Sequence, residues 1–302
     1  MELHQLRYFV AVAETGNFTR AAERSHVSQP SLSQQIMNLE KEVSHKLFHR
    51  LGRKTVLTEA GTAFLERARR ILFEVENAAR ELSDHPGLGR RITVGAVQTV
   101  MPYLIAPVIA RCRELHPNLL IYIREDFRSN MIQSVVEGDL DLAVVPLPVK
   151  DHRLSIEPLL TEPLLLVVGK KHPIASRTEI SINDLAAETF ISMGDSSTLA
   201  AQIRTFFGDH NFQPRIGLRC AQVATVKLFV AMGLGISILP QVARLADDRD
   251  SLTYLRLTGS EPTRELVVIR HLQRYQSRGA EQFLALLREH ARGRDNGNAG
   301  EP

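Results

Sequence analysis

Apolar residues recur with helical spacing in the first part of the chain, and this pattern predicts two amphipathic helices. The first begins near Leu3 and is stopped by Thr15-Gly16-Asn17, because glycine favours the end of a helix. The second carries one apolar stripe at spacings of four, three and four: Leu32, Ile36, Leu39 and Val43.

The stretch from Phe18 to Val43 predicts a short helix, a tight turn and the second amphipathic helix. Ser28 is a good N-cap, and Pro30 lies in the first turn, where its missing N–H costs nothing. The face opposite the apolar stripe is neutral before Glu40 and rich in hydrogen-bonding groups: Ser31, Ser33, Gln34, Gln35 and Asn38. This arrangement describes a helix-turn-helix that reads DNA, although a surface helical hairpin fits the spacing alone equally well.

The net positive charge of the chain lies entirely in its N-terminal third. Residues 1–91 hold 14 Lys and Arg against 11 Asp and Glu, whereas residues 92–302 hold 23 of each. Residues 44–58 contain four basic residues and no acid: Lys46, Arg50, Arg53 and Lys54. Short apolar segments on both sides, with Gly52 between them, predict a β-hairpin wing. Its basic residues are expected to lie along a DNA backbone or to enter a minor groove, and the alternative is an ordinary solvated hairpin.

A long helix is predicted after the wing, with Thr58 as its cap. Its narrow apolar stripe extends over some 25 residues: Ala60, Phe64, Ala68, Ile71, Val75, Ala78 and Leu82. Such a stripe favours packing against a second copy of the same helix. The following sequence, SDHPGLGRR, contains one Pro and two Gly and predicts a hinge.

From Ile92 onward short apolar strands alternate with helices, which predicts two successive α/β lobes with a cleft between them. The alternation also predicts that the sheets are mostly parallel. The expected strands are ITVGAV, LLIYIRED, DLAVVPL, TEPLLLVVG and GISILP, with shorter ones near residues 190–191, 216–220, 253–257 and 265–271. A terminal helix is expected over 275–292, and the final residues are expected to be disordered.

Composition narrows the class of protein further. No apolar run approaches the ~20 residues of a membrane span, and no secretory signal is visible, so we expect a cytoplasmic protein that does not contact membranes. Two cysteines, Cys112 and Cys220, make no disulfide framework, and the 11 histidines show no metal-binding spacing. No catalytic motif is present, so we expect neither an enzyme nor a cofactor.

These residues together resemble the LysR-type transcriptional regulators over nearly the full chain. The matching segments are LRYFVAVAETGNFTRAAERSHVSQPSLSQQIMNLE, LFHRLGRKTVLTEAG, GDLDLAVV and VAMGLGISILP. The resemblance implies an all-α winged helix-turn-helix in residues 1–58, a dimerising linker helix in 59–84, a hinge in 85–91 and an effector domain in 92–302. That domain is expected to be a two-lobed α/β unit of periplasmic-binding-protein type. Lobe I would comprise 92–162 and 268–292, lobe II 163–267, and a disordered tail 293–302.

The resemblance also implies the partners. Such proteins bind double-stranded promoter DNA at an inverted repeat, respond to a small effector and assemble as homotetramers, that is, dimers of dimers. Carried over by position, the residues that open the reading helix are Gln29, Pro30, Ser31 and Ser33. Gln29 and Ser33 are expected to contact base edges, and Thr19 and Ser31 phosphates. The complete set of expected DNA contacts is Thr19, Ser28, Gln29, Pro30, Ser31, Ser33, Gln34, Arg50, Arg53 and Lys54.

The effector site is expected in the cleft, where strand ends meet helix N-termini that attract anions. The residues at these positions are Gln98, Thr99, Arg128, Ser129, Pro146, Gly194, Ser196, Ser197, Thr198, Gln222 and Val223. Hydroxyl groups among them can hydrogen-bond a carboxylate and Arg128 can neutralise it, which indicates a small polar or anionic effector, such as an organic acid. The alternative for each Ser or Thr is a helix N-cap without a ligand.

The second half resembles the peroxide-sensing branch of the family in TVMPYLIAP, PLLTEPLLL and the loop at Ser192. That branch senses through a cysteine in this loop, but here Thr198 and Phe207 stand where thiols would be needed. Cys112 and Cys220 are expected in the core, so the thiol switch is expected to be absent. Alternatives to an effector-controlled regulator are a redox-responsive or ligand-independent regulator and a solute-binding protein.

Overall fold

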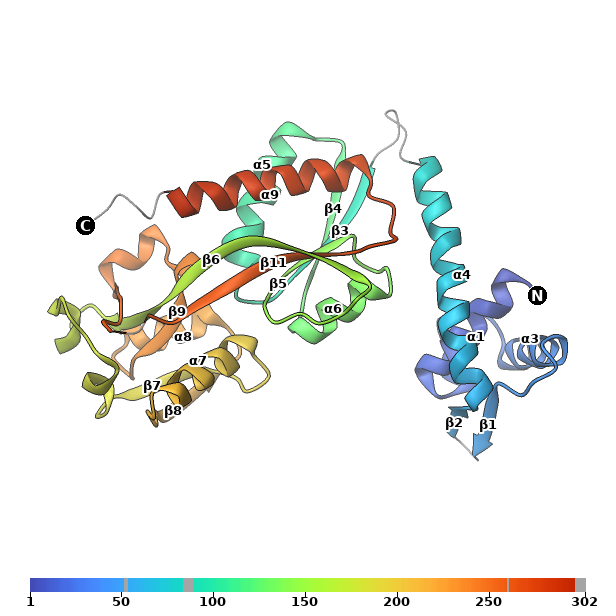
Figure 1. Ribbon diagram of the computed structural model, residues 1–302, viewed down its shortest axis with the longest axis horizontal. Coiled ribbons are helices and arrows are strands. Elements are labelled where there is room, and N and C mark those ends of the chain that lie inside the picture. Colours follow the sequence, from blue (N-terminus) through green and yellow to red (C-terminus); the bar gives the residue numbers. More distant parts are fainter. Residues whose placement is uncertain (52–53, 84–89, 260, 297–302) are drawn as a thin grey trace. The chain divides into compact units, whose positions relative to one another are not determined.

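The structure is a computed structural model of the chain and describes residues 1–51, 54–83, 90–259 and 261–296. The chain forms two compact units, Met1–His85 and Pro86–Pro302 (Figure 1). A helical unit with a two-stranded wing is followed by a two-lobed α/β unit, so the predicted fold class is confirmed.

The N-terminal unit follows the sequence pattern closely. Its elements are α1 (Leu3–Thr15), α2 (Phe18–Arg24), α3 (Gln29–Glu42), β1 (Phe48–Leu51), β2 (Lys54–Leu57) and α4 (Glu59–Ser83). Gly16 ends α1 in the left-handed conformation at φ +60°. The Asn17 side chain caps α2 by accepting from the N–H of Thr19, at 2.8 Å, and from that of Arg20, at 3.1 Å.

The core of this unit forms where the helices cross. Its largest fully buried side chains are those of Leu6, Phe9, Leu32, Ile36, Leu39 and Leu47. The ring of Phe9 lies 5.2 Å from that of Phe48 at the start of the wing and 5.1 Å from that of Phe64 in α4. The three helices, the wing and the linker helix therefore share one apolar cluster.

The linker helix α4 keeps part of its apolar stripe exposed. Ala68 is fully buried against the unit's core, whereas Ile71 is 37% exposed and Leu82 84% exposed. The stripe thus continues along the helix beyond the part that the unit's own core covers.

The C-terminal unit contains the remaining elements. Its strands are β3 (Arg90–Ala96), β4 (Leu119–Glu125), β5 (Leu142–Pro146), β6 (Leu154–Gly169), β7 (Thr189–Met193), β8 (Arg215–Cys220), β9 (Ser237–Pro240), β10 (Leu252–Leu255) and β11 (Thr263–His271). Its α-helices are α5 (Ala106–Leu115), α6 (Arg128–Val136), α7 (Thr198–Asp209), α8 (Val223–Ala231) and α9 (Arg278–Asn296). A π-helical turn, η1 (Met101–Ile105), precedes α5, and short 3-10 turns join the elements of the second lobe: η2 (Pro173–Ser176), η3 (Ile182–Leu185), η4 (Gln241–Ala243) and η5 (Ala246–Asp250).

Lobe I is a sheet in the order β6-β11-β5-β3-β4, covered by helices on both faces. Helices α5 and α9 pack against each other on one face, and α6 contacts β3, β5 and β11 from the other (Figure 1). Lobe II contains β10 and β9 on either side of the end of β6, and the parallel pair β7 and β8. Helix α8 packs against strands of this second lobe.

The sheets differ from the expectation that they are mostly parallel. The parallel pairs are β3 with β4, β3 with β5 and β7 with β8, but all pairs that β6 and β11 make are antiparallel. The reason is the 16-residue strand β6, which pairs with β11 over Leu154–Pro163 and with β9 and β10 over Leu164–Gly169. Because β6 carries the chain into lobe II and β11 carries it back alongside β6, the two strands run in opposite directions.

Three expected boundaries also need correction. Strand β3 already begins at Arg90 and pairs with β4 there, so residues 90 and 91 are not hinge; residues 84–89 lie outside the described part of the chain. Leu266 and Val267 pair with β5 in lobe I, so the return to this lobe precedes residue 268. Helix α9 continues to Asn296, so the expected tail at 293–302 starts too early, and its last six residues, 297–302, are not described.

Because α9 is closely packed, shortening one of its buried side chains is expected to leave a cavity and to lower stability substantially. Leu287 in α9 is 0% exposed, so Leu287→Ala is expected to lower the free energy of unfolding of the C-terminal unit by about 2–5 kcal/mol. The matched variant Leu272→Ala, at a residue 61% exposed, is expected to cost less than about 0.5 kcal/mol. Urea denaturation followed by circular dichroism measures both, and equal costs for the two variants would contradict the packing described.

Candidate functional site

The N-terminal end of α3 presents an exposed polar face. Gln29, Pro30, Ser31 and Gln34 are exposed, and the first turn of the helix contains no acidic residue. The Ser28 hydroxyl accepts from the N–H of Ser31 at 3.4 Å, which agrees with its expected capping role. Gln29 and Ser31 therefore project from a capped helix end, where amide and hydroxyl groups are available to an external partner.

One residue of the expected contact set is less exposed than the others in α3. Ser33 is only 9% exposed and lies on the same side of α3 as the buried Leu32 and Ile36. The position follows from helical geometry, because Ser33 is adjacent to Leu32 and three residues before Ile36. Because Ser33 also lies four residues after Gln29, on the same side of the helix, its expected contact with a base edge stays a prediction. Thr19 is exposed in the first turn of α2, where its N–H is bonded to the Asn17 side chain.

The wing is an antiparallel hairpin in which Phe48 pairs with Leu57 and Leu51 with Lys54. The backbone of β2 is tied to the end of α1, since the N–H of Thr55 donates to the carbonyl oxygen of Gly16 at 3.0 Å. Of the expected wing contacts, Arg53 lies outside the described residues, as do the side chains of Arg50 and Lys54.

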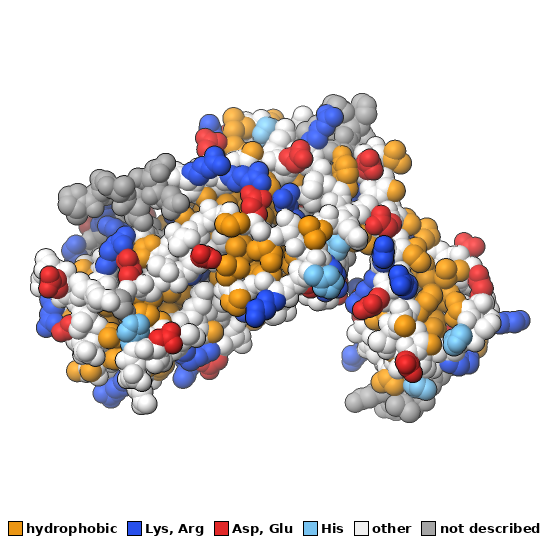
Figure 2. Space-filling model, viewed as in Figure 1, with side chains coloured by type: hydrophobic (Ala, Val, Ile, Leu, Met, Phe, Trp, Pro, Cys, Tyr) orange, Lys and Arg blue, Asp and Glu red, His pale blue; other side chains and the backbone are white. Residues whose placement is uncertain are grey.

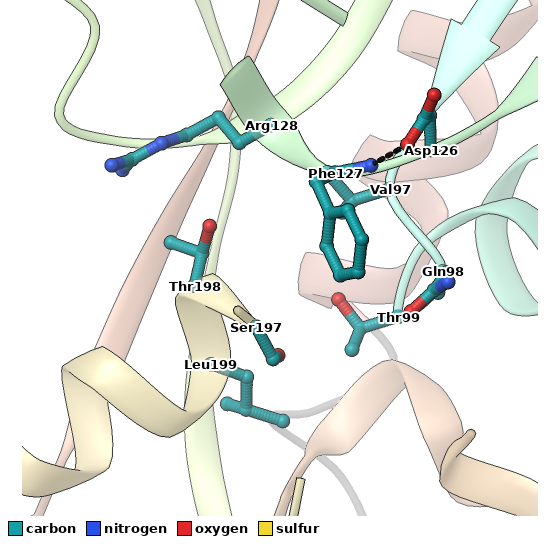
Figure 3. A pocket seen from close by; sticks show the side chains of 9 residues that line it. All are labelled: Val97, Gln98, Thr99, Asp126, Phe127, Arg128, Ser197, Thr198 and Leu199. Carbon is teal, nitrogen blue, oxygen red and sulfur yellow. Dashed lines mark hydrogen bonds between the residues drawn. The ribbon is translucent and has the colours of Figure 1, made fainter. Parts of the chain in front are cut away.

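A pocket in the C-terminal unit lies between the two lobes (Figure 3). It contains about 270 Å³ of space, including solvent at its mouth. Three segments line it, two from lobe I and one from lobe II: Val97, Gln98 and Thr99; Asp126, Phe127 and Arg128; Ser197, Thr198 and Leu199. Five of the expected effector residues are therefore brought together: Gln98, Thr99, Arg128, Ser197 and Thr198.

Thr99 is fixed in the pocket wall by a buried charged network. Thr99 is 4% exposed, and its hydroxyl oxygen accepts from Nη1 of Arg264 at 2.8 Å. The Arg264 guanidinium also pairs with Glu162 at 2.8 Å, and the second oxygen of Glu162 accepts from the N–H of Val242 at 2.7 Å. Because the Thr99 hydroxyl already accepts a bond from a cation, its own proton is left to be donated to another acceptor.

The opposite wall is the N-terminus of α7. Ser197 is the N-cap residue of this 12-residue helix, but its hydroxyl makes no capping bond. Figure 3 shows the side chains of Ser197 and Thr99 facing each other across the pocket, with the Phe127 ring beside them. The N–H groups of a helix's first turn attract anions, so this wall suits an acceptor group with negative charge.

The two charged residues of the pocket wall point away from Thr99 (Figure 3). Asp126 Oδ1 accepts from the N–H of Phe127 at 2.7 Å and from Nδ2 of Asn130 at 2.9 Å, so this carboxylate is held at the start of α6. The Arg128 guanidinium extends past Thr198, and its buried Nη1 has no hydrogen-bond partner within the described part of the chain. A buried donor without a partner favours an anion nearby. The Arg128 side chain would reach an anion bound at Thr99 only after reorientation.

The other expected effector residues do not line this pocket. Val223 is 3% exposed and belongs to the core, Pro146 is buried at the end of β5, and Gly194 donates its N–H to the carbonyl of Cys220. Ser129, Ser196 and Gln222 are exposed outside the lining. They share the expected position at an element end, but the position alone does not determine which ends converge.

Sequence reasoning missed four lining residues: Val97, Asp126, Phe127 and Leu199. Val97, Phe127 and Leu199 are each next to an expected residue, and Val97 and Asp126 directly follow β3 and β4. Three of the four supply apolar or aromatic surface, so the pocket suits a compact ligand with an apolar body as well as a polar group.

Both cysteines are buried, as expected for core residues. Cys112 in α5 is 0% exposed and Cys220 in β8 is 7% exposed, and burial raises the pKa of both thiols. Phe207 is buried 5.3 Å from the ring of Phe190, so an aromatic cluster occupies this part of lobe II. The described residues include no cluster of His, Cys, Asp and Glu suited to a metal ion.

No helix in the described part of the chain is long and apolar enough to cross a membrane. On the face shown in Figure 2, Lys and Arg side chains of the C-terminal unit are interspersed with Asp and Glu, in agreement with the balance of 23 against 23 in residues 92–302.

Comparison with known proteins gives two family matches. Residues 3–62 match the bacterial regulatory helix-turn-helix protein, lysR family, and residues 85–292 match the LysR substrate binding domain. A hydrogen peroxide-inducible genes activator of Pectobacterium carotovorum subsp. carotovorum is 32% identical over 297 residues, covering 97% of this chain and 98% of that protein. The Hca operon transcriptional activator HcaR of Escherichia coli (strain K12) is 36% identical over 242 residues, covering 80% and 82%. Among solved structures, a variant of full-length OxyR from Pseudomonas aeruginosa superposes with a TM-score of 0.70 at 25% identity, covering 97% of this chain and 95% of that one.

Proposed function

Because the chain belongs to the LysR family of transcriptional regulators, we propose that it reads a promoter sequence with the N-terminal face of α3 and responds to a small anion bound between its two lobes. The proposal for the ligand rests on the Thr99 hydroxyl. It accepts from Arg264 and therefore offers its proton to an acceptor facing the N-terminus of α7. The protein acts in the cytoplasm, where its DNA is.

The DNA surface consists of the exposed α3 residues and the wing. Gln29 and Gln34 supply amide groups that can pair bidentately with adenine, and Thr19 and Ser31 supply hydroxyl groups for phosphates. Ser28 and Pro30 shape the helix end on which these residues sit. Arg50, Arg53 and Lys54 supply the charge that attracts the DNA backbone.

The ligand is proposed to be a compact organic acid. Its carboxylate would accept from Thr99, Ser197 and Thr198 and from the first N–H groups of α7, with Arg128 turning toward it. Its apolar body would lie against Phe127 and Leu199. The narrow space between the three lining segments favours a small molecule.

We also propose that the protein works as a homo-oligomer, a dimer of dimers. The exposed part of the apolar stripe on α4, including Ile71 and Leu82, supports pairing of two copies through this helix. A dimer matches the two-fold symmetry of an inverted repeat in DNA.

The DNA surface predicts different effects of two variants. Gln29→Ala is expected to lose about 1–3 kcal/mol of discrimination between the preferred duplex and a scrambled one, or roughly 5- to 150-fold. Arg53→Ala is expected to weaken binding to both duplexes equally and to lower the slope of log affinity against log salt by about one. Fluorescence anisotropy on a duplex selected from a random library by the wild-type protein measures both.

Gln213→Ala, at an exposed glutamine of lobe II, is the matched control and is expected to bind like the wild type. If Gln29→Ala discriminated as well as this control, the assigned reading face would be wrong. If Arg53→Ala kept the wild-type salt slope, the wing contact would be wrong.

The pocket predicts which variants bind a ligand poorly. A thermal-shift screen of small organic acids supplies the ligand, because a molecule that binds only the folded state raises the melting temperature. Thr99→Val and Ser197→Ala are each expected to weaken its binding about 10-fold or more, since a hydrogen bond to a charged group contributes about 1.5–3 kcal/mol. Calorimetry measures the affinities.

Two matched variants test the position of the pocket. Thr99→Ser keeps the hydroxyl and Ser129→Ala changes a residue outside the lining, so both are expected to stay within about threefold of the wild type. Wild-type affinity in both Thr99→Val and Ser197→Ala would show that the ligand binds elsewhere.

The relatives named for hydrogen peroxide suggest a second function, a response through thiols. We do not expect it, because the thiolate is the reactive form and burial raises the pKa of Cys112 and Cys220. Exposure to peroxide is expected to leave the affinity for the selected duplex within about twofold. A larger shift that disappears in the Cys112→Ala, Cys220→Ala double variant would establish the redox function instead.

A further inference from the structure

The segment Lys46–Phe48, which leads from α3 into the first residue of the wing, is bound from two sides in the N-terminal unit. The N–H groups of Leu47 and Phe48 donate to Oε1 of Glu40, at 2.9 and 3.3 Å. On the other side Thr58 donates its N–H to the carbonyl of Leu47 at 3.0 Å and its hydroxyl to the carbonyl of Lys46 at 2.7 Å. Glu40 belongs to the last turn of α3, and Thr58 directly precedes α4.

The Glu40 carboxylate is buried with both of its oxygens bonded. Glu40 is 8% exposed, and its Oε2 accepts from Nζ of Lys46 at 2.7 Å. The Lys46 side chain is 75% exposed, so this ion pair contributes little in water. The two bonds from backbone N–H groups are buried and charge-assisted, and they are therefore the stronger constraint.

The first turn of α4 lies in close contact with the same segment. A Cβ atom added at Gly61 would lie 2.1 Å from the carbonyl oxygen of Leu47, and the N–H of Gly61 donates to the Thr58 hydroxyl at 2.9 Å. The first turn of α4 thus packs directly on the Leu47 carbonyl. The start of the wing is consequently held between α3 and α4, with Glu40 as its link to α3.

We propose that Glu40 is a positioning residue for DNA binding, which holds the wing in a fixed position relative to α3 so that both engage one duplex. The inference rests on the proposed wing contacts. Without the carboxylate, two buried N–H groups lose their acceptor and β1 is no longer tied to α3. The basic residues of the wing then add less to binding, although every one of them is still present.

Whether Glu40→Ala raises or lowers the affinity for DNA distinguishes a positioning role from a simple effect of charge. Removing a carboxylate from a DNA-binding unit by itself raises its affinity for phosphates. Positioning predicts the opposite, a loss of affinity in Glu40→Ala. Glu42→Ala is the matched control: Glu42 ends the same helix, has a side chain 52% exposed and pairs with the N-terminal amine.

The experiment measures affinity for the selected duplex over a range of salt concentrations, with and without Arg53→Ala. Glu40→Gln is expected to stay within about threefold of the wild type, because its amide oxygen still accepts both N–H bonds. Glu40→Ala is expected to bind about 10-fold more weakly or worse, with a lower salt slope. Arg53→Ala also weakens binding in the Glu40→Ala background, but there it is expected to lower the logarithm of the affinity by less than half as much as it does in the wild-type background.

Circular dichroism and hydrogen exchange at the amides of Leu47 and Phe48 check the fold, and Glu40→Asp replaces Glu40→Ala if the latter does not fold. Wild-type affinity in the folded variant, or a full effect of Arg53→Ala within it, would overturn the role of Glu40 alone. If Arg53→Ala did not change the affinity in the wild-type background, the wing contact itself would be wrong, and this inference with it.

Discussion

A buried ion pair between Glu162 and Arg264 lies where the two long strands of the C-terminal unit run side by side. Their side chains are 4% and 0% exposed, and their residues are paired neighbours in β6 and β11. Removing one partner of such a pair leaves an uncompensated buried charge, typically at a cost of about 3–5 kcal/mol. The pair therefore requires β6 and β11 to keep their register at the passage between the lobes.

The same pair connects this passage to the pocket. Arg264 donates to the hydroxyl and the carbonyl oxygen of Thr99, and Glu162 accepts from Val242 in η4. The proposed ligand, which would accept a hydrogen bond from the Thr99 hydroxyl, would thus be joined through the side chains of Thr99 and Arg264 to the strands that both lobes share. Because Arg264 contacts both Thr99 and the paired strands β6 and β11, a ligand bound at Thr99 could change how the two lobes are arranged relative to each other.

Much of the fold could be predicted because its determinants are local. Helical spacing of apolar residues, the stop at Gly16 and the cap at Ser28 fix the helices of the N-terminal unit, and the structure agrees to within a residue or two. Strand direction and length depend instead on distant pairing, so neither the 16 residues of β6 nor its antiparallel partners were visible. Ser33 is less exposed than its polarity suggested, because its position in the helix borders the buried Leu32 and Ile36.

In the candidate sites, too, some residues could be predicted from the sequence and others could not. The polar groups of the pocket could be predicted from strand ends and helix starts, but their apolar neighbours Phe127 and Leu199 carry no chemical signal in the sequence. Arg264 was missed because its partner Glu162 lies 102 residues earlier in the chain. Glu40 was missed because nothing in a helical pattern indicates that its carboxylate accepts from backbone N–H groups beyond the helix end.

Genome-wide footprinting of the full chain in its native cell tests the central claim, regulation of promoters by sequence-specific DNA binding. The account predicts protected sites concentrated at a small number of promoters, each containing an inverted repeat that matches a dimer. A chain that protects no site above background, or that protects DNA without regard to sequence, would contradict it.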